Sequence, residues 1–360
     1  MKIRDRYIAK TLLSYTIIVL VVWTSIYSFF NFLAELNSVG KDGYTILSAF
    51  TYIILQLPEV AYKQASPIIL LGCILGMGHL ATTGQLLIFR VSGASILKIT
   101  LLTIKNSLIF VLFFISIGEF LAPISSNLAK SSKSNAIGNS IASINQNGFW
   151  IRDGDNFINV KRNIDGRLFS GITIIEVNSS NEIERVIKSE NAIFDGDSLD
   201  MSGSEIFSID ESSSFDRISL KERNSYDKTV SFDQDLIDSL EKEPEDLSTW
   251  TLIKQIRFLS DNKLRSGVFE VELYKRLIQP ITLIAMILLA MLFIFGSIRD
   301  VTLGRKIFFG VALGLSFEML SRVASAMALG FDFSPFLSSI LPSIVVMFIA
   351  VILLLKKSFS

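Results

Sequence analysis

The chain has 360 residues, of which 50% are hydrophobic, and its 34 basic residues balance its 34 acidic residues. A formal net charge of zero argues against a nucleic-acid-binding protein, in which a basic face is expected. The single cysteine, Cys73, excludes an intrachain disulfide, and with the single histidine, His79, it leaves too few ligands for a His/Cys metal site. The sequence contains neither a phosphate-binding loop of the Gly-x-x-x-x-Gly-Lys-Ser/Thr type nor a Gly-x-Ser-x-Gly elbow, so we expect a non-catalytic chain without a cofactor.

Long uncharged apolar runs predict membrane-spanning helices. Thr11–Leu33 holds 23 residues without a charged side chain, and about 20 helical residues cross a hydrocarbon core of roughly 30 Å. Residues 2–10 predict a short basic interfacial helix before this run, which is too long for the apolar core of a cleaved signal peptide. The 14-residue run Tyr44–Leu57 ends before Pro58 and is too short to span, so we expect an interfacial or re-entrant segment.

Two further spans are predicted before residue 124. Ala65–Leu86 contains three glycines that permit close helix packing, Gly72, Gly76 and Gly78. The connector Ala81–Ser95 follows, and the third span is Ile99–Pro123.

Residues 124–246 have the pattern of an all-β domain. Turn signals every 8–15 residues separate β-branched and aromatic runs, which predicts a sandwich or a jelly-roll-like sheet. The turn signals lie at Asp153–Asn156, Asn163–Gly166, Asn178–Asn181 and Asp195–Asp197. Calcium binding is one interpretation of the aspartates, but Asp-Gly and Gly-Asp pairs form hairpins, and we interpret them as turn residues.

The remaining residues return to a helical and then to an apolar pattern. Ser248–Asp261 predicts a helix whose apolar face holds Trp250, Ile253, Ile256, Phe258 and Leu259. Three spans follow at Leu277–Ile298, Ile307–Phe331 and Pro335–Leu355. The predicted organisation is therefore three spans in 1–123, a β-domain in 124–246, a connecting helix in 247–276 and three spans in 277–357.

The basic residues of the short loops predict the orientation. With a cytoplasmic N-terminus, the inner segments hold twelve basic residues: Lys2, Arg4, Arg6, Lys10, Arg90, Lys98, Lys105, Arg299, Arg305, Lys306, Lys356 and Lys357. The short outer segments then hold only Lys41 and Lys63. By the positive-inside rule, both termini are cytoplasmic and the β-domain faces outward.

The connector is the first candidate site. Thr83–Val91 predicts a short cytoplasmic helix that ends at Ser92-Gly93, and its candidate contact residues are Gln85, Leu86, Leu87, Phe89 and Arg90. Such a helix can dock its apolar residues in a cleft of a cytoplasmic partner, which we favour, or it can lie on the lipid headgroups.

Basic residues at the outer leaflet form the second candidate site. Lys130 and Lys133 follow the third span and lie three residues apart, hence on one helical face. With Lys41 and Arg276 they are candidates for binding the phosphates of an anionic lipid, because lysine acts as a point charge and arginine as a fork. The alternative is that they are ordinary flanking residues that extend to the headgroups.

The third candidate is an acid–base pair inside the fifth span. Glu318 and Arg322 have i,i+4 spacing, and a charge at the bilayer centre costs about 2.5–3.5 kcal/mol on insertion scales. They are expected to neutralise each other along one helix. Two interpretations stay open: they line a cavity or couple helix movement, or they hold two helices together.

Five stretches together resemble one family over essentially the whole chain. They are Asp5–Lys10, Gly118–Pro123, Gly148–Phe157, Gln279–Pro280 and Phe293–Gly296. With these motifs the chain resembles the lipopolysaccharide export permeases of the LptF/LptG family and is most similar to its LptG type.

The resemblance implies a subunit of an ABC transporter in the bacterial inner membrane. Two six-span permeases, LptF and LptG, would enclose a cavity, a cytoplasmic LptB dimer would hydrolyse ATP, and LptC and LptA would receive lipopolysaccharide from the periplasmic β-domains. It also implies that the connector is the coupling helix, and that Lys130 and Lys133 match basic positions near the lipid A phosphates. Two departures stand out: residues 33–38 lack the lysines of relatives, and Gln85 stands where an acidic residue is familiar.

Two other classes of protein share parts of this layout. A membrane receptor with a ligand-sensing β-domain usually adds a cytoplasmic signalling domain, whereas the predicted cytoplasmic segments here are short. A lipoprotein-releasing permease of the usual type has four spans, whereas six are predicted here. Both alternatives are therefore disfavoured.

Overall fold

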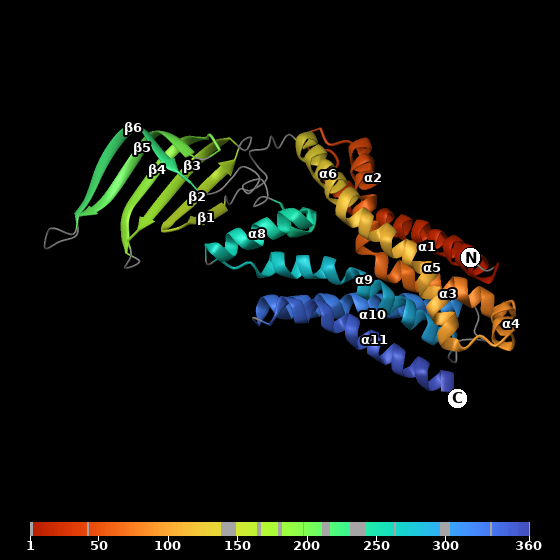
Figure 1. Ribbon diagram of the computed structural model, residues 1–360. Coiled ribbons are helices and arrows are strands. Elements are labelled where there is room, and N and C mark those ends of the chain that lie inside the picture. Colours follow the sequence, from red (N-terminus) through yellow and green to blue (C-terminus); the bar gives the residue numbers. More distant parts are fainter. Residues whose placement is uncertain are drawn as a thin grey trace. The chain divides into compact units, whose positions relative to one another are not determined.

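A computed structural model describes residues 3–41, 43–137, 149–163, 167–178, 182–196, 198–210, 217–230, 242–262, 264–295, 303–331 and 333–359. These residues form two compact units, a helical one and one that contains a β-sheet (Figure 1). The first comprises Met1–Val39, Ala49–Ala129 and Gly267–Ser360, and the second comprises Gly40–Ser48 and Lys130–Ser266. Several predictions lie outside the described residues: turn residues 164–166, 179–181 and 197, motif residues Gly148 and Gly296, the span end 296–298, Lys2 and Arg299.

The six predicted spans are confirmed in the described part of the chain, which contains six helices long and apolar enough to cross a membrane. They are α1 (Ile3–Glu35), α3 (Ala65–Thr82), α5 (Ile96–Ser116) with its continuation, α9 (Gly267–Ile294), α10 (Leu303–Gly330) and α11 (Pro335–Phe359). The predicted interfacial helix at the N-terminus is the first part of α1. A short 3-10 turn, η1 (Leu36–Ser38), follows α1.

Helix α2 (Ile46–Lys63) differs from its prediction, because it continues through Pro58 instead of ending before it. A proline inside a helix removes one backbone hydrogen bond. Val60 and Ala61 are buried beyond the proline, and the last turn carries an ion pair of 2.6 Å between Lys63 Nζ and Glu59 Oε1. These contacts stabilise the part of the helix beyond the proline.

The third span also continues beyond its predicted end. After α5 the chain makes a π-helical turn, η2 (Ile117–Leu121), and then forms α6 (Ala122–Ala136). Pro123 therefore lies near the start of α6 and does not end the helical run. Proline has no N–H, so the carbonyl of Glu119, four residues earlier, loses its usual α-helical donor, which is consistent with a wide turn at this point.

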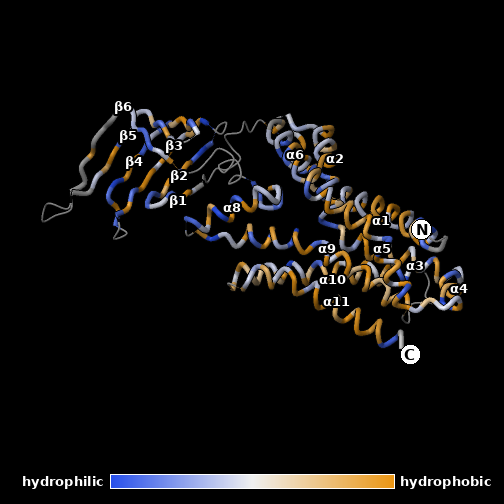
Figure 2. The backbone as a smooth tube through the Cα atoms, viewed as in Figure 1, coloured by the Kyte–Doolittle hydropathy of each residue, from blue (hydrophilic) through white to orange (hydrophobic). Residues whose placement is uncertain are grey.

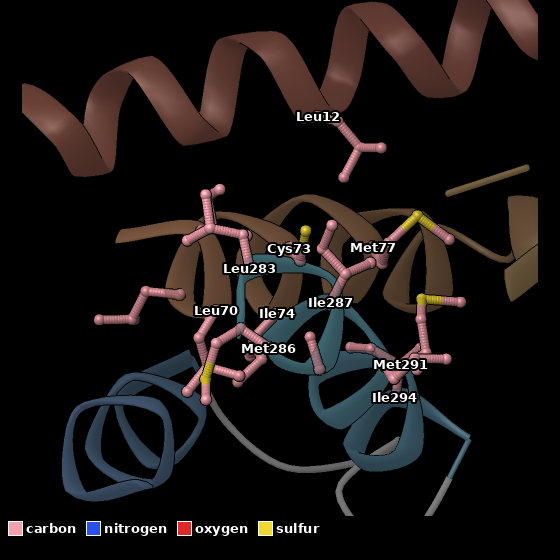
Figure 3. Close-up of a cluster of buried hydrophobic side chains, with 14 of the residues drawn as sticks. Leu12, Leu70, Cys73, Ile74, Met77, Leu283, Met286, Ile287, Met291 and Ile294 are labelled. Carbon is pink, nitrogen blue, oxygen red and sulfur yellow. The ribbon is translucent and has the colours of Figure 1, made fainter. Parts of the chain in front are cut away.

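Helix α3 lies at the centre of the helical unit. Its buried residues cover all sides of the helix, which is the pattern expected of a helix surrounded by others. Figure 3 shows side chains from three helices meeting there: Leu12 of α1, Leu70, Cys73, Ile74 and Met77 of α3, and Leu283, Met286, Ile287, Met291 and Ile294 of α9. The core of the helical unit thus forms around α3.

All three predicted small-residue positions on α3 lie against other helices, at different distances. A Cβ atom on Gly72 would lie 2.5 Å from Thr16 Oγ1 and 2.9 Å from Thr16 Cα, whereas one on Gly76 would lie 3.4 Å from Leu12 Cδ2. A Cβ on Gly78 would lie 3.3 Å from Lys306 Nζ of α10. Gly72 therefore sets the closest approach of α1 to α3.

We expect Gly72→Ala to destabilise the helical unit by about 1–3 kcal/mol, because the added carbon meets the backbone of α1, which cannot rotate away. Gly76→Ala is the matched control, since its added carbon makes an ordinary contact with a leucine side chain. Thermal unfolding in detergent measures the difference. Equal melting temperatures for the two variants would show that α1 and α3 do not pack as described.

The second unit contains the predicted β-domain. Its described strands form one antiparallel sheet in chain order: β1 (Phe149–Asp153), β2 (Asn156–Asn163), β3 (Leu168–Val177), β4 (Ile183–Phe194), β5 (Ser198–Asp210) and β6 (Arg217–Thr229). Each strand pairs with the next, so the described strands form a meander, without the crossovers of a full jelly roll or a second layer among them. Alternating apolar and polar residues along the strands (Figure 2) give this sheet one buried face.

Two predicted turns fall on described residues. Asp153 pairs with Asn156 across a two-residue loop in which Gly154 has φ +60°. Gly196 has φ +91° next to Asp195, whose N–H donates to Ser198 O at 3.0 Å. Positive φ favours glycine. The aspartates at both positions therefore lie in tight hairpin turns.

The sheet is strongly curved, as contacts between β6 and strands that are not its neighbours show. Lys228 Nζ of β6 lies 2.5 Å from Glu176 Oε1 of β3 and donates to Asn156 Oδ1 of β2 at 3.2 Å. Arg185 Nε of β4 lies 3.3 Å from the other oxygen of Glu176. This polar cluster adjoins the apolar core of the sheet, where Ile158, Ile174 and Ile187 are buried. This curvature encloses an apolar core with a single meandering sheet, which explains why its sequence resembles that of a jelly-roll-like sheet.

Helix α8 (Thr249–Asp261) follows a 3-10 turn, η4 (Pro244–Asp246), and begins after Ser248, whose side chain accepts a hydrogen bond from the Thr251 N–H. The predicted apolar face is only partly correct. Leu252, Gln255 and Leu259 are buried, whereas the predicted Trp250 and Ile253 are exposed. Phe258 packs against the core of the sheet, and this contact sets the rotation of the helix.

Candidate functional site

The connector between α3 and α5 contains a short helix, α4 (Gln85–Val91), at the predicted place. Gly84 before it has φ +74° and Gly93 after it has φ +83°, so left-handed glycines bound the helix on both sides. Because Gly84 breaks the chain direction, α3 ends at Thr82 instead of at the predicted Leu86. Two tight bends therefore position one short rigid helix.

The exposed face of α4 is not the predicted one. Leu86 is buried and Phe89 packs against the core of the helical unit, so neither is available as an anchor. The exposed apolar side chains are Leu87, at 49%, with Ile88 at 66% and Val91 at 81%. Sequence reasoning missed Ile88 and Val91, because the alternation of apolar residues along seven positions does not show which side the core covers.

The polar residues of α4 also divide between the inside and the surface. The side-chain oxygen of Gln85 is buried and accepts no hydrogen bond among the described residues. Arg90 is exposed in the last turn. Of the two, only the Arg90 side chain is placed at the surface for a charged contact.

Lys130 forms ion pairs within its own unit. Its ammonium lies 2.7 Å from Glu243 Oε2 and also donates to Asp246 Oδ2. The Asp246 side chain is 2% exposed, whereas that of Glu243 is 73% exposed. The predicted phosphate ligand is therefore held by two carboxylates that lie just before α8.

Lys133 and Lys41 lie in the same unit as Lys130. Lys133 stands in the last turn of α6. Lys41 is exposed in a loop that two backbone hydrogen bonds stabilise, from Tyr44 N to Lys41 O at 2.8 Å and from Gly40 N to Tyr44 O at 2.9 Å. Tyr44, whose N–H donates to Lys41, is buried.

Arg276 does not lie on an exposed rim, contrary to its selection as a phosphate ligand. Its side chain is 7% exposed, and its Nε donates to Glu272 Oε1 at 3.1 Å, within α9. Burial raises the pKa of the Tyr62 phenol on α2, and Arg276, Glu272 and Glu119 lie close enough to affect it. The arginine thus belongs to a buried polar cluster of α2, η2 and α9. Sequence reasoning missed Tyr62, because no spacing pattern links it to residues in two other helices.

Glu318 and Arg322 form the predicted i,i+4 contact, in which Arg322 Nε donates to Glu318 Oε1 at 3.1 Å. Both residues belong to α10, and Arg322 is 69% exposed. Within this chain the pair therefore does not hold two helices together, and its arginine lies on the surface of the helical unit.

The remaining candidate ligand residues do not form a metal centre in the described part of the chain, where no three His, Cys, Asp or Glu residues come together. Cys73 is buried with a free thiol, and the His79 ring stacks on Tyr15 at 5.4 Å between centroids. The candidate sites are thus surfaces and ion-pair clusters.

Comparison with known proteins agrees with this architecture. The sequence profile of the family "Lipopolysaccharide export system permease LptF/LptG" matches residues 6–356. The chain is 27% identical over 360 residues to the lipopolysaccharide export system permease protein LptG of Escherichia coli (strain K12), with 98% of each chain covered. It is 28% identical over 345 residues to the LptG of Haemophilus influenzae, with 94% of each covered. With six candidate spans, a β-domain inserted in the sequence between the third and the fourth, and a family match over nearly its whole length, the chain belongs to the LptF/LptG family of lipopolysaccharide export system permeases.

Proposed function

We propose that this chain is the LptG-type half of a permease that takes lipopolysaccharide from the outer leaflet of the bacterial inner membrane and delivers it to a periplasmic bridge. The observation that carries the proposal is the family match over residues 6–356, together with the likeness to two LptG proteins over 94–98% of their length. An LptF-type permease is the expected second half, and the two would enclose the lipid between them.

The proposed orientation places both termini and α4 in the cytoplasm and the β-domain in the periplasm. It is supported by the twelve basic residues of the inner segments against two in the short outer ones. An even number of spans also returns the chain to its starting side, and Figure 1 shows both termini and α4 at one end of the helical unit.

In this proposal α4 couples the permease to a cytoplasmic LptB dimer that hydrolyses ATP. Leu87, Ile88 and Val91 would fill an apolar cleft of the ATPase, and Arg90 would supply a charged contact at its rim. Gln85, with its oxygen buried, would support the helix from inside. Closure of the ATPase dimer would then move α4 and compress the space that holds the lipid.

Lys130, Lys133 and Lys41 form the proposed basic rim for the phosphates of the lipid. They share one unit, and the buried core of the helical unit includes none of them. Phosphate would compete with Glu243 and Asp246 for the Lys130 ammonium. We do not include Arg276 in this rim, because its side chain is buried and forms an ion pair with Glu272. The β-domain would pass the expelled lipid to LptC and LptA.

Reconstitution tests this function directly. We expect the chain to co-purify with tagged LptB only when an LptF-type permease is co-expressed, and the complex to show ATPase activity that added lipopolysaccharide raises. A complex with an LptB variant that lacks its catalytic base is the control. A stable complex with no response to lipopolysaccharide would contradict the proposed substrate.

Cysteine labelling tests the proposed orientation. Cys73 is buried, whereas Ser225 of β6 and Ser92 beyond α4 are exposed. We expect a membrane-impermeant maleimide to label Ser225→Cys in intact spheroplasts and Ser92→Cys only after permeabilisation. The reverse pattern would invert the topology.

A further inference from the structure

The π-helical turn η2 is packed against one aromatic side chain. A Cβ atom on Gly118 would lie 2.2 Å from Cε2 and 2.4 Å from Cδ2 of Tyr62. Both distances are far below any normal carbon contact, so the ring occupies the space that a side chain at residue 118 would need. Tyr62 comes from α2 and Gly118 is buried in η2, so two elements distant in sequence interlock here.

Charged side chains also lie near the turn. Burial raises the pKa of the Tyr62 phenol, and three charged residues lie close enough to shift it further: Arg276 of α9 lowers it, and Glu272 of α9 and Glu119 of η2 raise it. Arg276 is 7% and Glu272 14% exposed. Charged side chains buried within a membrane protein are expensive unless they compensate one another. Side chains of α2, η2 and α9 therefore come together at the turn.

The turn determines which face of α6 is buried. A π-turn contains one residue more than an α-turn, so its conversion to α-helix would rotate all following residues by about 100°. After the turn, Ala122, Ser126 and Ala129 are buried on one face, whereas Ile124 and Leu128 are exposed. Lys130 and Lys133 continue the same helix, so the turn also sets the direction of both lysines.

We propose that Tyr62 is a positioning residue for the lipid-binding rim: its ring maintains the π-turn at Ile117–Leu121 and so determines the face of α6 on which Lys130 and Lys133 project. The functional part of this inference rests on the proposed role of these lysines. The conformational part does not, because it concerns only the packing of α2 against η2 and the rotation of α6.

Cysteine reactivity measures the rotation without lipid or partners. In the full chain with Cys73→Ala, purified in detergent, Ser126→Cys reports the buried face and Leu128→Cys the exposed one. We expect Gly118→Ala to raise labelling of Ser126→Cys by N-ethylmaleimide about tenfold, because the added carbon and the ring cannot share one space. Tyr62→Phe keeps the ring and is expected to leave labelling unchanged.

Rescue separates this role from general destabilisation. Tyr62→Ala alone is expected to raise labelling of Ser126→Cys, and the double variant Gly118→Ala with Tyr62→Ala is expected to label less than Gly118→Ala alone, because the new methyl group occupies space that the ring has left. If the double variant labels as strongly as Gly118→Ala or more strongly, Tyr62 does not act through Gly118 and the proposal is overturned. Unchanged labelling in both single variants overturns it as well.

The same variants in the reconstituted complex test the functional part. ATPase stimulation by purified lipopolysaccharide is expected to fall in Gly118→Ala, to recover partly in the double variant and to stay normal in Tyr62→Phe. If labelling of Ser126→Cys changes among these variants as predicted but ATPase stimulation does not, the positioning of α6 is supported and the role of the lysine rim is contradicted. If ATPase stimulation changes among the variants as predicted but labelling of Ser126→Cys does not, the positioning role of Tyr62 is overturned.

Discussion

An Ile88→Asp substitution is expected to abolish capture of the ATPase subunit while the permease itself stays folded. Ile88 is 66% exposed on α4, so the carboxylate meets water in the isolated chain. In the proposed complex the same carboxylate would be buried in an apolar cleft, where a central anchor residue is worth about 2 kcal/mol or more. Co-purification with tagged LptB should fall at least about thirtyfold, which is the factor that this free energy gives.

Two control variants show whether the exposed face matters. Ser92→Asp places the same charge just beyond α4, where the chain is exposed, and should not change capture. Leu86→Ala removes a buried side chain that belongs to the core. The cavity is expected to reduce the free energy of unfolding by about 2–5 kcal/mol, and so to lower the melting temperature. If Ile88→Asp retains capture, the docking face lies elsewhere on the helical unit.

A Lys130→Glu substitution is expected to have the second large effect, because it places a third carboxylate beside Glu243 and Asp246. Asp246 is 2% exposed and would lose its ammonium partner. Breaking a fully buried pair costs about 3–5 kcal/mol, and about 1–3 kcal/mol is expected here because Lys130 is partly exposed. Thermal unfolding of the purified chain measures this loss, and binding of lipopolysaccharide should fall with it.

A milder change separates the structural role of Lys130 from lipid binding. Glu243→Gln removes the exposed carboxylate that competes with phosphate and keeps Asp246 in place. If Lys130 binds phosphate, photo-crosslinking to lipopolysaccharide should increase roughly two- to fivefold, the range that an exposed ion pair of about 0.4–1 kcal/mol allows. Lys130→Gln should decrease it. If both variants bind lipid as the unchanged chain does, Lys130 has only a structural role.

Prediction from sequence succeeded for the long apolar runs and for the glycine turns. Thr11–Leu33 and the later apolar runs became helices, because uncharged residues of that number can satisfy their backbone inside a bilayer only as helix. The turn at Asp153–Asn156 formed as a hairpin, because Gly154 tolerates its positive φ. The short helix predicted at Thr83–Val91 is also present, although it begins at Gln85, after Gly84.

Prediction failed for residues whose type and spacing are compatible with either a buried or an exposed position. Arg276 had the position of a rim cation, but Glu272, one turn earlier, and the neighbouring helices bury it. Leu86 and Phe89 were as apolar as Ile88, and only the side on which the core lies turned them inward. Trp250 was expected inside and lies outside for the same reason.

By itself, the amino-acid sequence determined how many times this chain can cross a membrane, that strands are inserted between the third and fourth spans and that Gly154 and Gly196 lie in turns, because burial of apolar runs and backbone dihedral preferences act over a few residues. Only the tertiary structure decided which face of α4 is exposed, that Lys130 lies between two carboxylates and that Tyr62 fills the space beside Gly118. These features depend on contacts between residues up to 116 positions apart, and no local pattern encodes a contact at that separation.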